Sequence, residues 1–174
     1  MEFKAETKKL LDIVAKSLYT DSEVFVRELL SNASDALEKQ RFKDQSNIDL
    51  NISVELYPSK NQLVIQDNGI GMSKENLIEM LGTIAKSGSK EFVQNLEGGS
   101  ETQENIIGQF GVGFYSSFIV ADRVEVTSRE DDGQAHKWIS EGHGTFEVEE
   151  AEDSELVRGT RIVLHLKEEH KRFS

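Results

Sequence analysis

The sequence contains no cysteine, few basic residues and no long apolar run. Without cysteine, disulfide bonds and thiolate metal sites are excluded. No apolar stretch approaches the length of about 20 residues that a membrane-spanning helix needs. The 20 Lys and Arg residues are outnumbered by 32 Asp and Glu residues, which gives a net charge of −12. Because nucleic-acid affinity comes largely from basic patches, this composition disfavours a role in binding DNA or RNA.

The length and the apolar content fit one substantial hydrophobic core. The chain has 174 residues, of which 37% are hydrophobic, and this size predicts a single domain over residues 1–174. Residues with helical spacing come early, and alternating strand-like residues come late. We therefore expect an α+β fold, a two-layer sandwich in which helices cover one face of a mostly antiparallel sheet. The expected helices are Thr7–Leu18, Thr20–Arg41, a short helix from the cap Ser73 toward Leu81, and Val112–Val120; the expected strands are Asn51–Tyr57, Gln62–Gln66, Arg123–Arg129, Ala135–Ser140, Thr145–Glu149 and Thr160–Leu166.

Four polar side chains form one stripe along the second expected helix. Glu28, Asn32, Asp35 and Lys39 follow each other at intervals of three or four residues, whereas the rest of the helix is largely apolar. A carboxylate and an amide at this spacing often line a solvated helix face. The same pair also suits phosphate chemistry, because an amide oxygen can bind Mg²⁺ and a carboxylate one turn away can orient a water molecule.

A second motif, Asp67-Asn68-Gly69-Ile70-Gly71-Met72, follows the expected strand Gln62–Gln66. Two glycines let the backbone approach a flat ligand closely. The carboxylate of Asp67 can accept a hydrogen bond from an amino group, such as that of adenine. The alternative is a tight strand-to-helix turn in which Asp67 and Asn68 act as turn formers.

A third motif, Gly108 to Phe114, is rich in glycine and opens an apolar stretch that ends at Val120. Backbone N–H groups at the start of a helix suit phosphate oxygens. Its G-x-x-G-x-G order departs from the dinucleotide-binding fingerprint, and the segment Gly82–Lys90 departs from the P-loop pattern. Residues 82–109 are dominated by glycine, serine and other polar residues, which is typical of a functional lid. Lys86 within them is a candidate phosphate ligand, with a solvated surface lysine as the alternative.

Taken together and in this order, the motifs resemble those of the Bergerat-fold ATPases, and within them the heat-shock protein 90 family. The similarity to that family is almost position by position over Tyr19–Glu28, Leu81–Lys90 and Ile107–Asp122, and it covers essentially the whole chain. Residues Glu2–Lys39 are most similar to the mitochondrial paralogue of the family. One departure is Met80, which stands where eukaryotic members commonly carry Asn and bacterial members His.

The resemblance implies a role for each motif in binding and hydrolysing ATP. It implies that Glu28 is the general base that orients the attacking water and that Asn32 binds Mg²⁺ on the phosphates. Asp67 would accept the adenine amino hydrogen, with Thr160 supporting it through water, and residues 82–109 would form the ATP lid. The implied nucleotide-binding residues are Asn32, Asp35, Asp67, Gly71, Met72, Lys86, Gly111, Val112, Gly113, Phe114 and Thr160.

The resemblance also implies cofactors, partners and a location. It implies ATP or ADP with Mg²⁺, client proteins and homodimerisation for the longer protein, and a monomeric, slowly hydrolysing isolated domain. The implied location is mitochondrial, with the cytoplasm as the alternative. Because the family continues into middle and dimerisation domains, we expect an excised, C-terminally shortened fragment. Two other functions remain open: a nucleotide-gated interaction module without meaningful hydrolysis, and another Bergerat-fold ATPase such as a topoisomerase or a histidine kinase.

Overall fold

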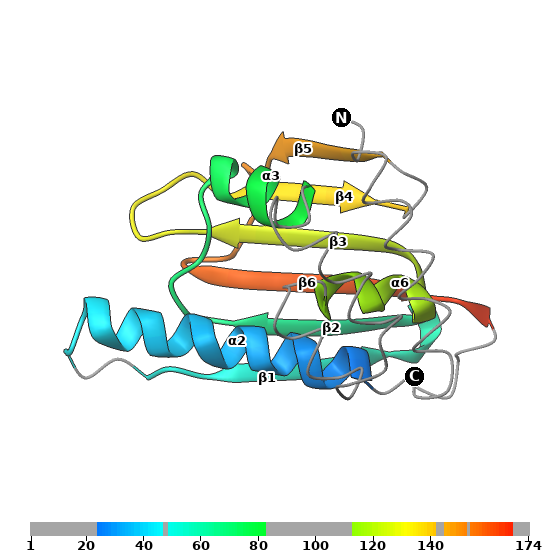
Figure 1. Cartoon of the computed structure of the whole chain (residues 1–174), viewed down its shortest axis with the longest axis horizontal. Helices are drawn as coiled ribbons and strands as arrows, with labels where there is room; N and C mark the ends of the chain where they lie inside the picture. Colours follow the sequence, from blue (N-terminus) through cyan, green and yellow to red (C-terminus); the bar gives the residue numbers. More distant parts are fainter. Residues whose placement is uncertain (1–23, 47–48, 83–112, 142–144, 153, 169–174) are drawn as a thin grey trace, which may run out of the picture.

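The computed structural model describes residues 24–46, 49–82, 113–141, 145–152 and 154–168. Within these residues three α-helices, two 3₁₀ turns and six strands follow one another along the chain (Figure 1). The helical elements are α2 (Val24–Lys43), η1 (Pro58–Lys60), α3 (Lys74–Gly82), η2 (Gly113–Ser116) and α6 (Ser117–Val120). The strands are β1 (Ile52–Tyr57), β2 (Gln62–Asp67), β3 (Ala121–Arg129), β4 (His136–Ser140), β5 (Phe146–Glu150) and β6 (Gly159–Leu166).

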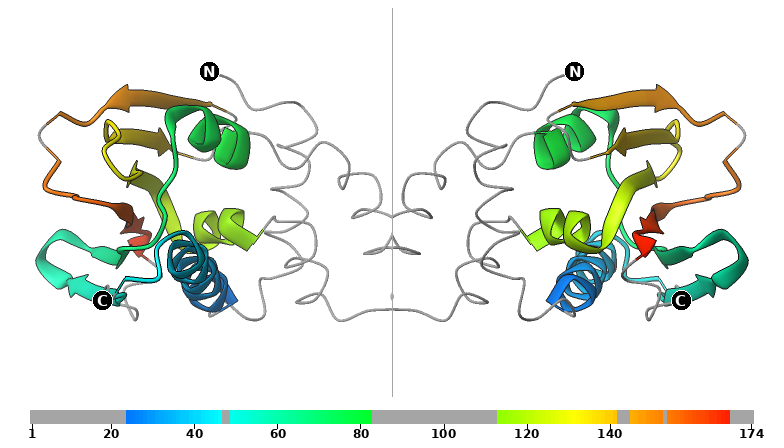
Figure 2. Two further views of the ribbon diagram at one scale, coloured as in Figure 1. Left: turned by 90° about the vertical axis from the view of Figure 1, so that its left-hand side faces the viewer. Right: turned by 90° about the vertical axis from the view of Figure 1, so that its right-hand side faces the viewer.

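The six strands form one sheet in the order β1-β2-β6-β3-β4-β5, and each neighbouring pair is antiparallel. The helices α2, α3 and α6 all lie on one face of this sheet (Figure 2). The predicted α+β sandwich is therefore confirmed. The last strand, β6, inserts between β2 and β3, so residues far apart in the sequence meet on adjacent strands.

The core lies between the sheet and the helices, and the sequence pattern explains why. In α2 the residues Phe25, Leu29 and Ala33 recur at four-residue intervals and are buried, as expected for a helix that packs one face on a sheet. In β3 the inward residues alternate with outward ones. Trp138 is fully buried, and its ring lies edge-on to that of Phe114 at 5.6 Å between ring centroids.

The structure confirms most of the predicted elements and divides one of them. Ser73 caps α3 as expected, because its Oγ accepts the N–H of Asn76 at 3.2 Å. The expected helix Val112–Val120 is instead the 3₁₀ turn η2 followed by the single α-turn of α6. Glycine and serine are weak helix formers, and β3 begins directly at Ala121, which leaves room for only short helical turns.

Some predicted elements lie outside the described residues. These are the helix Thr7–Leu18 and all of the predicted lid 82–109 beyond its first residue. In the described part of the chain, no helix is long and apolar enough to cross a membrane.

Candidate functional site

Asp67 ends β2 on the helix-covered face of the sheet. Its register partner on β6 is Thr160, which pairs in turn with Ser128 on β3. These three residues form a row across adjacent strands, and we call it the inner row. Only 6% of Asp67 is exposed. Burial raises the pKa of its carboxyl group from 3.8 to about 6, and backbone hydrogen bonds from Gly69 and Thr160 oppose that rise.

The loop after Asp67 is bound to helix α2. The N–H of Gly69 donates to Asp67 Oδ1 at 2.9 Å, and the N–H of Ile70 donates to the carbonyl oxygen of Ala36 at 3.1 Å. A side chain at Gly69 would place its Cβ 2.6 Å from the carbonyl carbon of Ala36, so only glycine lets the loop approach the helix this closely. Gly71 has a positive φ of 71°, as the predicted close-approach loop requires.

The hydroxyl of Ser128 connects three parts of the site. It accepts the N–H of Met72 at 2.9 Å, donates to the carbonyl oxygen of Gly159 at 3.0 Å, and lies 2.8 Å from Thr160 Oγ1. A serine hydroxyl has one proton and two lone pairs. With that proton given to Gly159, the Thr160 hydroxyl donates to Ser128 and keeps its own lone pairs for other donors.

Sequence reasoning missed Ser128, although a signal was present. Along β3, Val124, Val126 and Ser128 alternate on the core-facing side, and all three are buried. A polar residue that continues an apolar face needs hydrogen-bond partners. The alternation of residues 124, 126 and 128 therefore indicates Ser128 as a candidate site residue.

The predicted stripe on α2 includes Asn32, which lies one turn before Ala36, the residue that contacts this loop. Residues four apart share a helix face, so Glu28, Asn32 and Ala36 form one row, and Ala36 is the residue bonded to the loop of Asp67. Glu28 is half-buried, whereas Asn32 and Asp35 are exposed. The predicted stripe is therefore partly solvated in the structure.

The other end of this row leads to the turn η2. The helix α2 contacts η2, which lies near the N-terminal end of the helix (Figure 1). The side chain of Phe114 is buried in the core against Trp138, so its backbone, and not its ring, is what a ligand can meet. The structure thus aligns Asp67, the α2 stripe and η2 along one face of the molecule.

The remaining predicted residues divide into two groups. Lys86, Gly111 and Val112 lie outside the described residues. Met80, on α3, is 62% exposed. Among the described residues there is no group of three His, Cys, Asp or Glu side chains that could hold a metal ion.

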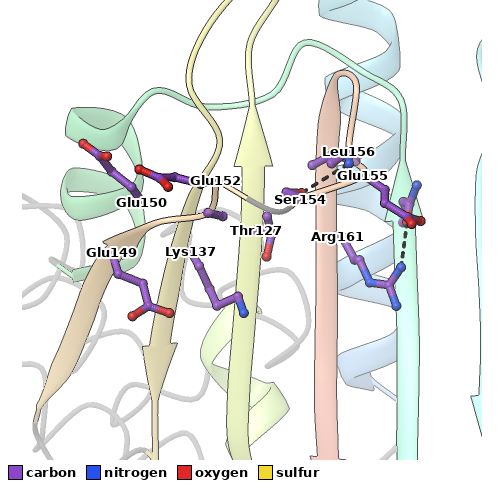
Figure 3. Close-up of a pocket in the computed structure, with 11 residues that line it drawn as sticks. Thr127, Lys137, Glu149, Glu150, Glu152, Ser154, Glu155, Leu156 and Arg161 are labelled. Atoms are coloured by element: carbon purple, nitrogen blue, oxygen red, sulfur yellow. Dashed lines mark hydrogen bonds between the residues drawn. The ribbon is translucent and has the colours of Figure 1, made fainter.

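A hollow of about 580 Å³ lies on the opposite, open face of the sheet (Figure 3). Its floor includes Gln66, Thr127 and Arg161, which pair across β2, β3 and β6 and which we call the outer row. It contains none of the predicted site residues. The glutamates that line it disfavour a polyphosphate through like-charge repulsion; they are Glu149, Glu150, Glu152 and Glu155.

Comparison with known proteins gives the family of the chain. A sequence model described as "Histidine kinase-, DNA gyrase B-, and HSP90-like ATPase" matches residues 19–160. The chain is 54% identical to "Heat shock protein 75 kDa, mitochondrial" of Bos taurus, over 99% of this chain and 25% of that protein. It is 52% identical to "Chaperone protein HtpG" of Desulfitobacterium hafniense, over 99% of this chain and 30% of that protein.

A third relative is "Chaperone protein HtpG" of Rickettsia prowazekii, which is 49% identical over 99% of this chain and 29% of that protein. The chain therefore spans 25% to 30% of the length of these relatives. The family match covers most of the chain and includes the inner row, the α2 stripe and η2. The chain belongs to the family of histidine kinase-, DNA gyrase B- and HSP90-like ATPases and is an ATP-binding domain of the HSP90 chaperone type.

Proposed function

We propose that the chain binds an adenine nucleotide with Mg²⁺ in a site that extends from Asp67 along α2 to η2. Asp67 carries this proposal: it is a buried carboxylate whose pKa burial raises to about 6. Keeping an ionisable group out of water costs free energy, and such groups gather at functional sites. A ligand that donates a hydrogen bond to the carboxylate offsets part of that cost.

The adenine base is assigned to the Asp67 end of the site. The carboxylate of Asp67 and the lone pairs of Thr160 Oγ1 are both hydrogen-bond acceptors, because the Thr160 proton is directed to Ser128. An amino group, or a water molecule held by it, supplies the donors that two acceptors need. Gly71 and Met72 border the base in this arrangement.

The phosphates are assigned to the stretch of α2 between Ala36 and η2. Asn32 would help to hold Mg²⁺ through its neutral amide oxygen, a ligand type that this ion accepts. The side chain of Asn32 is exposed on α2, so its amide oxygen is accessible to such an ion. When bound, the ion neutralises phosphate charge. Further proposed nucleotide contacts are Asp35, Lys86 and the backbone of Gly111, Val112, Gly113 and Phe114.

Glu28 is the proposed general base for hydrolysis. Its carboxylate lies one turn from Asn32 on α2 and is half-buried. From there it can orient a water molecule toward the terminal phosphate and accept its proton, which typically contributes about 10²–10⁴ in rate. Residues 82–109 are proposed to close over the nucleotide as a lid.

For the longer protein we propose ATP-dependent chaperone activity on client proteins, with homodimerisation and a mitochondrial location. The support is similarity to relatives named as a mitochondrial heat shock protein and as chaperone proteins. A bacterial relative is similar to nearly the same degree, so a cytoplasmic location is the alternative. We propose that the isolated domain is monomeric and hydrolyses ATP slowly.

Calorimetry with ADP and Mg²⁺ tests the binding proposal directly. We expect saturable binding that weakens when EDTA removes the metal ion, because a bound Mg²⁺ would neutralise phosphate charge and Asn32 would help to hold it. The absence of binding at millimolar ADP would overturn the proposal. Unchanged affinity in EDTA would overturn the assigned role of the metal ion alone.

Glu28→Ala separates hydrolysis from binding. We expect the variant to bind ADP like the wild type but to lose single-turnover ATP hydrolysis in the full-length protein by roughly 10²–10⁴-fold, the usual contribution of a general base. Retained turnover would remove Glu28 from this role. A wild-type protein that binds ATP without any turnover would instead favour a nucleotide-gated interaction module.

A further inference from the structure

Arg158 precedes β6 and lies against the loop that follows Asp67. Its side chain is only 16% exposed. Nε donates to the carbonyl oxygens of Asn68 and Gly69, each at 3.1 Å, and Nη2 donates to that of Asn68 at 2.9 Å. One guanidinium therefore binds two consecutive carbonyl groups of the loop, a contact that no sequence motif indicated.

These two carbonyls belong to the peptide units that join Asp67 to its loop and the loop to α2. In a trans peptide the C=O and the N–H point in opposite directions. The unit that carries the Asn68 carbonyl also carries the Gly69 N–H, which binds the carboxylate of Asp67. The unit that carries the Gly69 carbonyl also carries the Ile70 N–H, which binds Ala36 of α2. Both peptide planes are thus held at both ends.

Arg158 is itself anchored by a second element. Its Nη1 donates to Asp131 Oδ1 at 3.3 Å, and Asp131 Oδ2 lies 3.4 Å from Nζ of Lys43 at the end of α2. Asp131 belongs to the turn between β3 and β4. The planar fork of arginine can bind two carbonyls and a carboxylate together, whereas the single ammonium of lysine cannot match that geometry.

We propose that Arg158 is a positioning residue of the nucleotide site, which fixes the peptide planes that hold the Asp67 carboxylate and join its loop to α2. The inference rests on the proposed function for the identity of the ligand, whereas the contacts of Arg158 are independent of it. A cation on the Asn68 carbonyl also polarises that peptide, which makes the Gly69 N–H a stronger donor to Asp67. Arg158 acts on the ligand only through this loop.

The central test compares Arg158→Lys with Arg161→Lys in the full chain. Arg161 lies on β6 as well, but it is exposed and faces the open side of the sheet, and its hydrogen bond to Gln66 Oε1 is long at 3.4 Å. We expect Arg158→Lys to lower the ADP–Mg²⁺ affinity roughly tenfold, the order of one lost charge-assisted hydrogen bond. Arg161→Lys is expected to stay within about twofold of the wild type, as surface substitutions usually do.

Measurements without nucleotide distinguish positioning from a general loss of stability. In Arg158→Lys, the amide protons of Gly69 and Ile70 are expected to exchange faster, while those of β4 remain protected. NMR titration is expected to show a higher pKa for Asp67 than in the wild type. Asp131→Asn, which removes only the anchor, is expected to shift both readouts in the same direction and serves if Arg158→Lys does not fold.

Wild-type affinity together with wild-type amide exchange in Arg158→Lys would overturn the inference. Uniformly faster exchange across the sheet would also overturn it, because that result indicates a structural role only. If the wild-type chain itself binds no ADP, the proposed function fails, and amide exchange with the Asp67 titration still decides the role of Arg158.

Discussion

Two neighbouring rows of polar residues cross the same three strands and face opposite sides of the sheet. The inner row is Asp67, Thr160 and Ser128, and the outer row is Gln66, Arg161 and Thr127. They are offset by one residue along each strand, which is enough to reverse the direction of every side chain. Adjacent residues thus build a candidate ligand site on one face and a solvated, charged hollow on the other.

The rows differ in hydrogen bonding and, at Gln66 and Arg161, in burial, whereas Thr127 is buried like the inner row. The residues of the inner row are all buried, and backbone groups hold Asp67 and Ser128 in place. In the outer row, Arg161 is exposed, and in the described part of the chain it forms no ion pair. Hydrogen bonds formed away from water are stronger and more directional. Polar content alone therefore does not distinguish a binding site from a polar surface.

Of the substitutions in the two rows, Asp67→Asn is expected to weaken ADP binding most. The amide replaces a charged acceptor and directs an N–H₂ group toward donors, so one charge-assisted bond is lost and a buried donor is left unpaired. At about 1.5–3 and 1–3 kcal/mol, these losses correspond to a roughly thousandfold weaker ADP affinity. Calorimetry on the folded variant measures the change.

The outer row offers the matched control for this variant. Gln66→Glu makes the reverse exchange of amide and carboxylate one residue away, on the other face of the sheet. We expect its ADP affinity to remain within about twofold of the wild type. Equal losses in both variants would show that binding is sensitive to any exchange near the end of β2, whichever face of the sheet the side chain is on.

Gly71→Ala is expected to disrupt the close packing of the loop after Asp67 against the end of β3. Gly71 has a φ of 71°, and an added Cβ would lie 2.0 Å from the carbonyl oxygen of Arg129. A left-handed backbone costs roughly 1–2 kcal/mol and overpacking roughly 1–3 kcal/mol, so we expect the free energy of unfolding in urea to fall by about 3 kcal/mol.

Gly133→Ala is the control for that substitution, because Gly133 lies in the turn between β3 and β4. Among the described residues, the nearest atom to its added Cβ would be the carbonyl oxygen of Glu130 at 3.4 Å. We expect a change of no more than about 0.5 kcal/mol. A similar loss in both variants would contradict the steric explanation.

Part of the framework of both rows could be predicted from the sequence. The alternation of Ile162, Leu164 and Leu166 predicted the strand β6, and strands were also expected where β2 and β3 lie. The resemblance of the ordered motifs then selected Asp67 and Thr160 as a pair. Local periodicity and motif order are properties of the sequence itself, so both could be recognised from the chain alone.

What the sequence could not provide were contacts between segments far apart in the chain. Arg158 meets Asn68 across 90 positions, and no local pattern records such a contact. For the α2 stripe, sequence reasoning left a solvated helix face and a phosphate site as alternatives, and Asn32 and Asp35 are exposed in the structure. Spacing fixes which residues share a helix face, but tertiary packing decides how deeply that face is covered.

The pH dependence of stability measures what burial of Asp67 costs. Its folded-state pKa of about 6 lies above the ordinary 3.8, so between these values the folded state binds more protons than the unfolded state. Stability therefore falls as the pH rises through this interval. The full cost, about 3 kcal/mol, is present above the folded-state pKa.

We expect the unfolding free energy of the nucleotide-free wild type to fall by about 3 kcal/mol relative to Asp67→Asn across this interval. Subtracting the variant removes the contribution of every other titratable group. Urea titrations at successive pH values give both curves. A difference that does not change with pH would show that folding leaves the pKa of Asp67 unchanged and that burial of its carboxylate does not lower stability.

Gln40→Met separates the effect of burial from that of hydrogen bonding, because Gln40 is buried like the inner row but lacks comparable hydrogen bonds among the described residues. Gln40 is fully buried in α2, and neither its Oε1 nor its Nε2 has a hydrogen-bond partner in the described part of the chain. An unsatisfied buried polar group costs about 1–3 kcal/mol, so the isosteric apolar methionine should raise the unfolding free energy by about 1–2 kcal/mol.

Gln45→Met, at an exposed position, is the control and should change the unfolding free energy by no more than about 0.5 kcal/mol. If Gln40→Met destabilised the domain, the amide would have partners, such as ordered water, and hydrogen bonding would no longer distinguish Gln40 from the inner row.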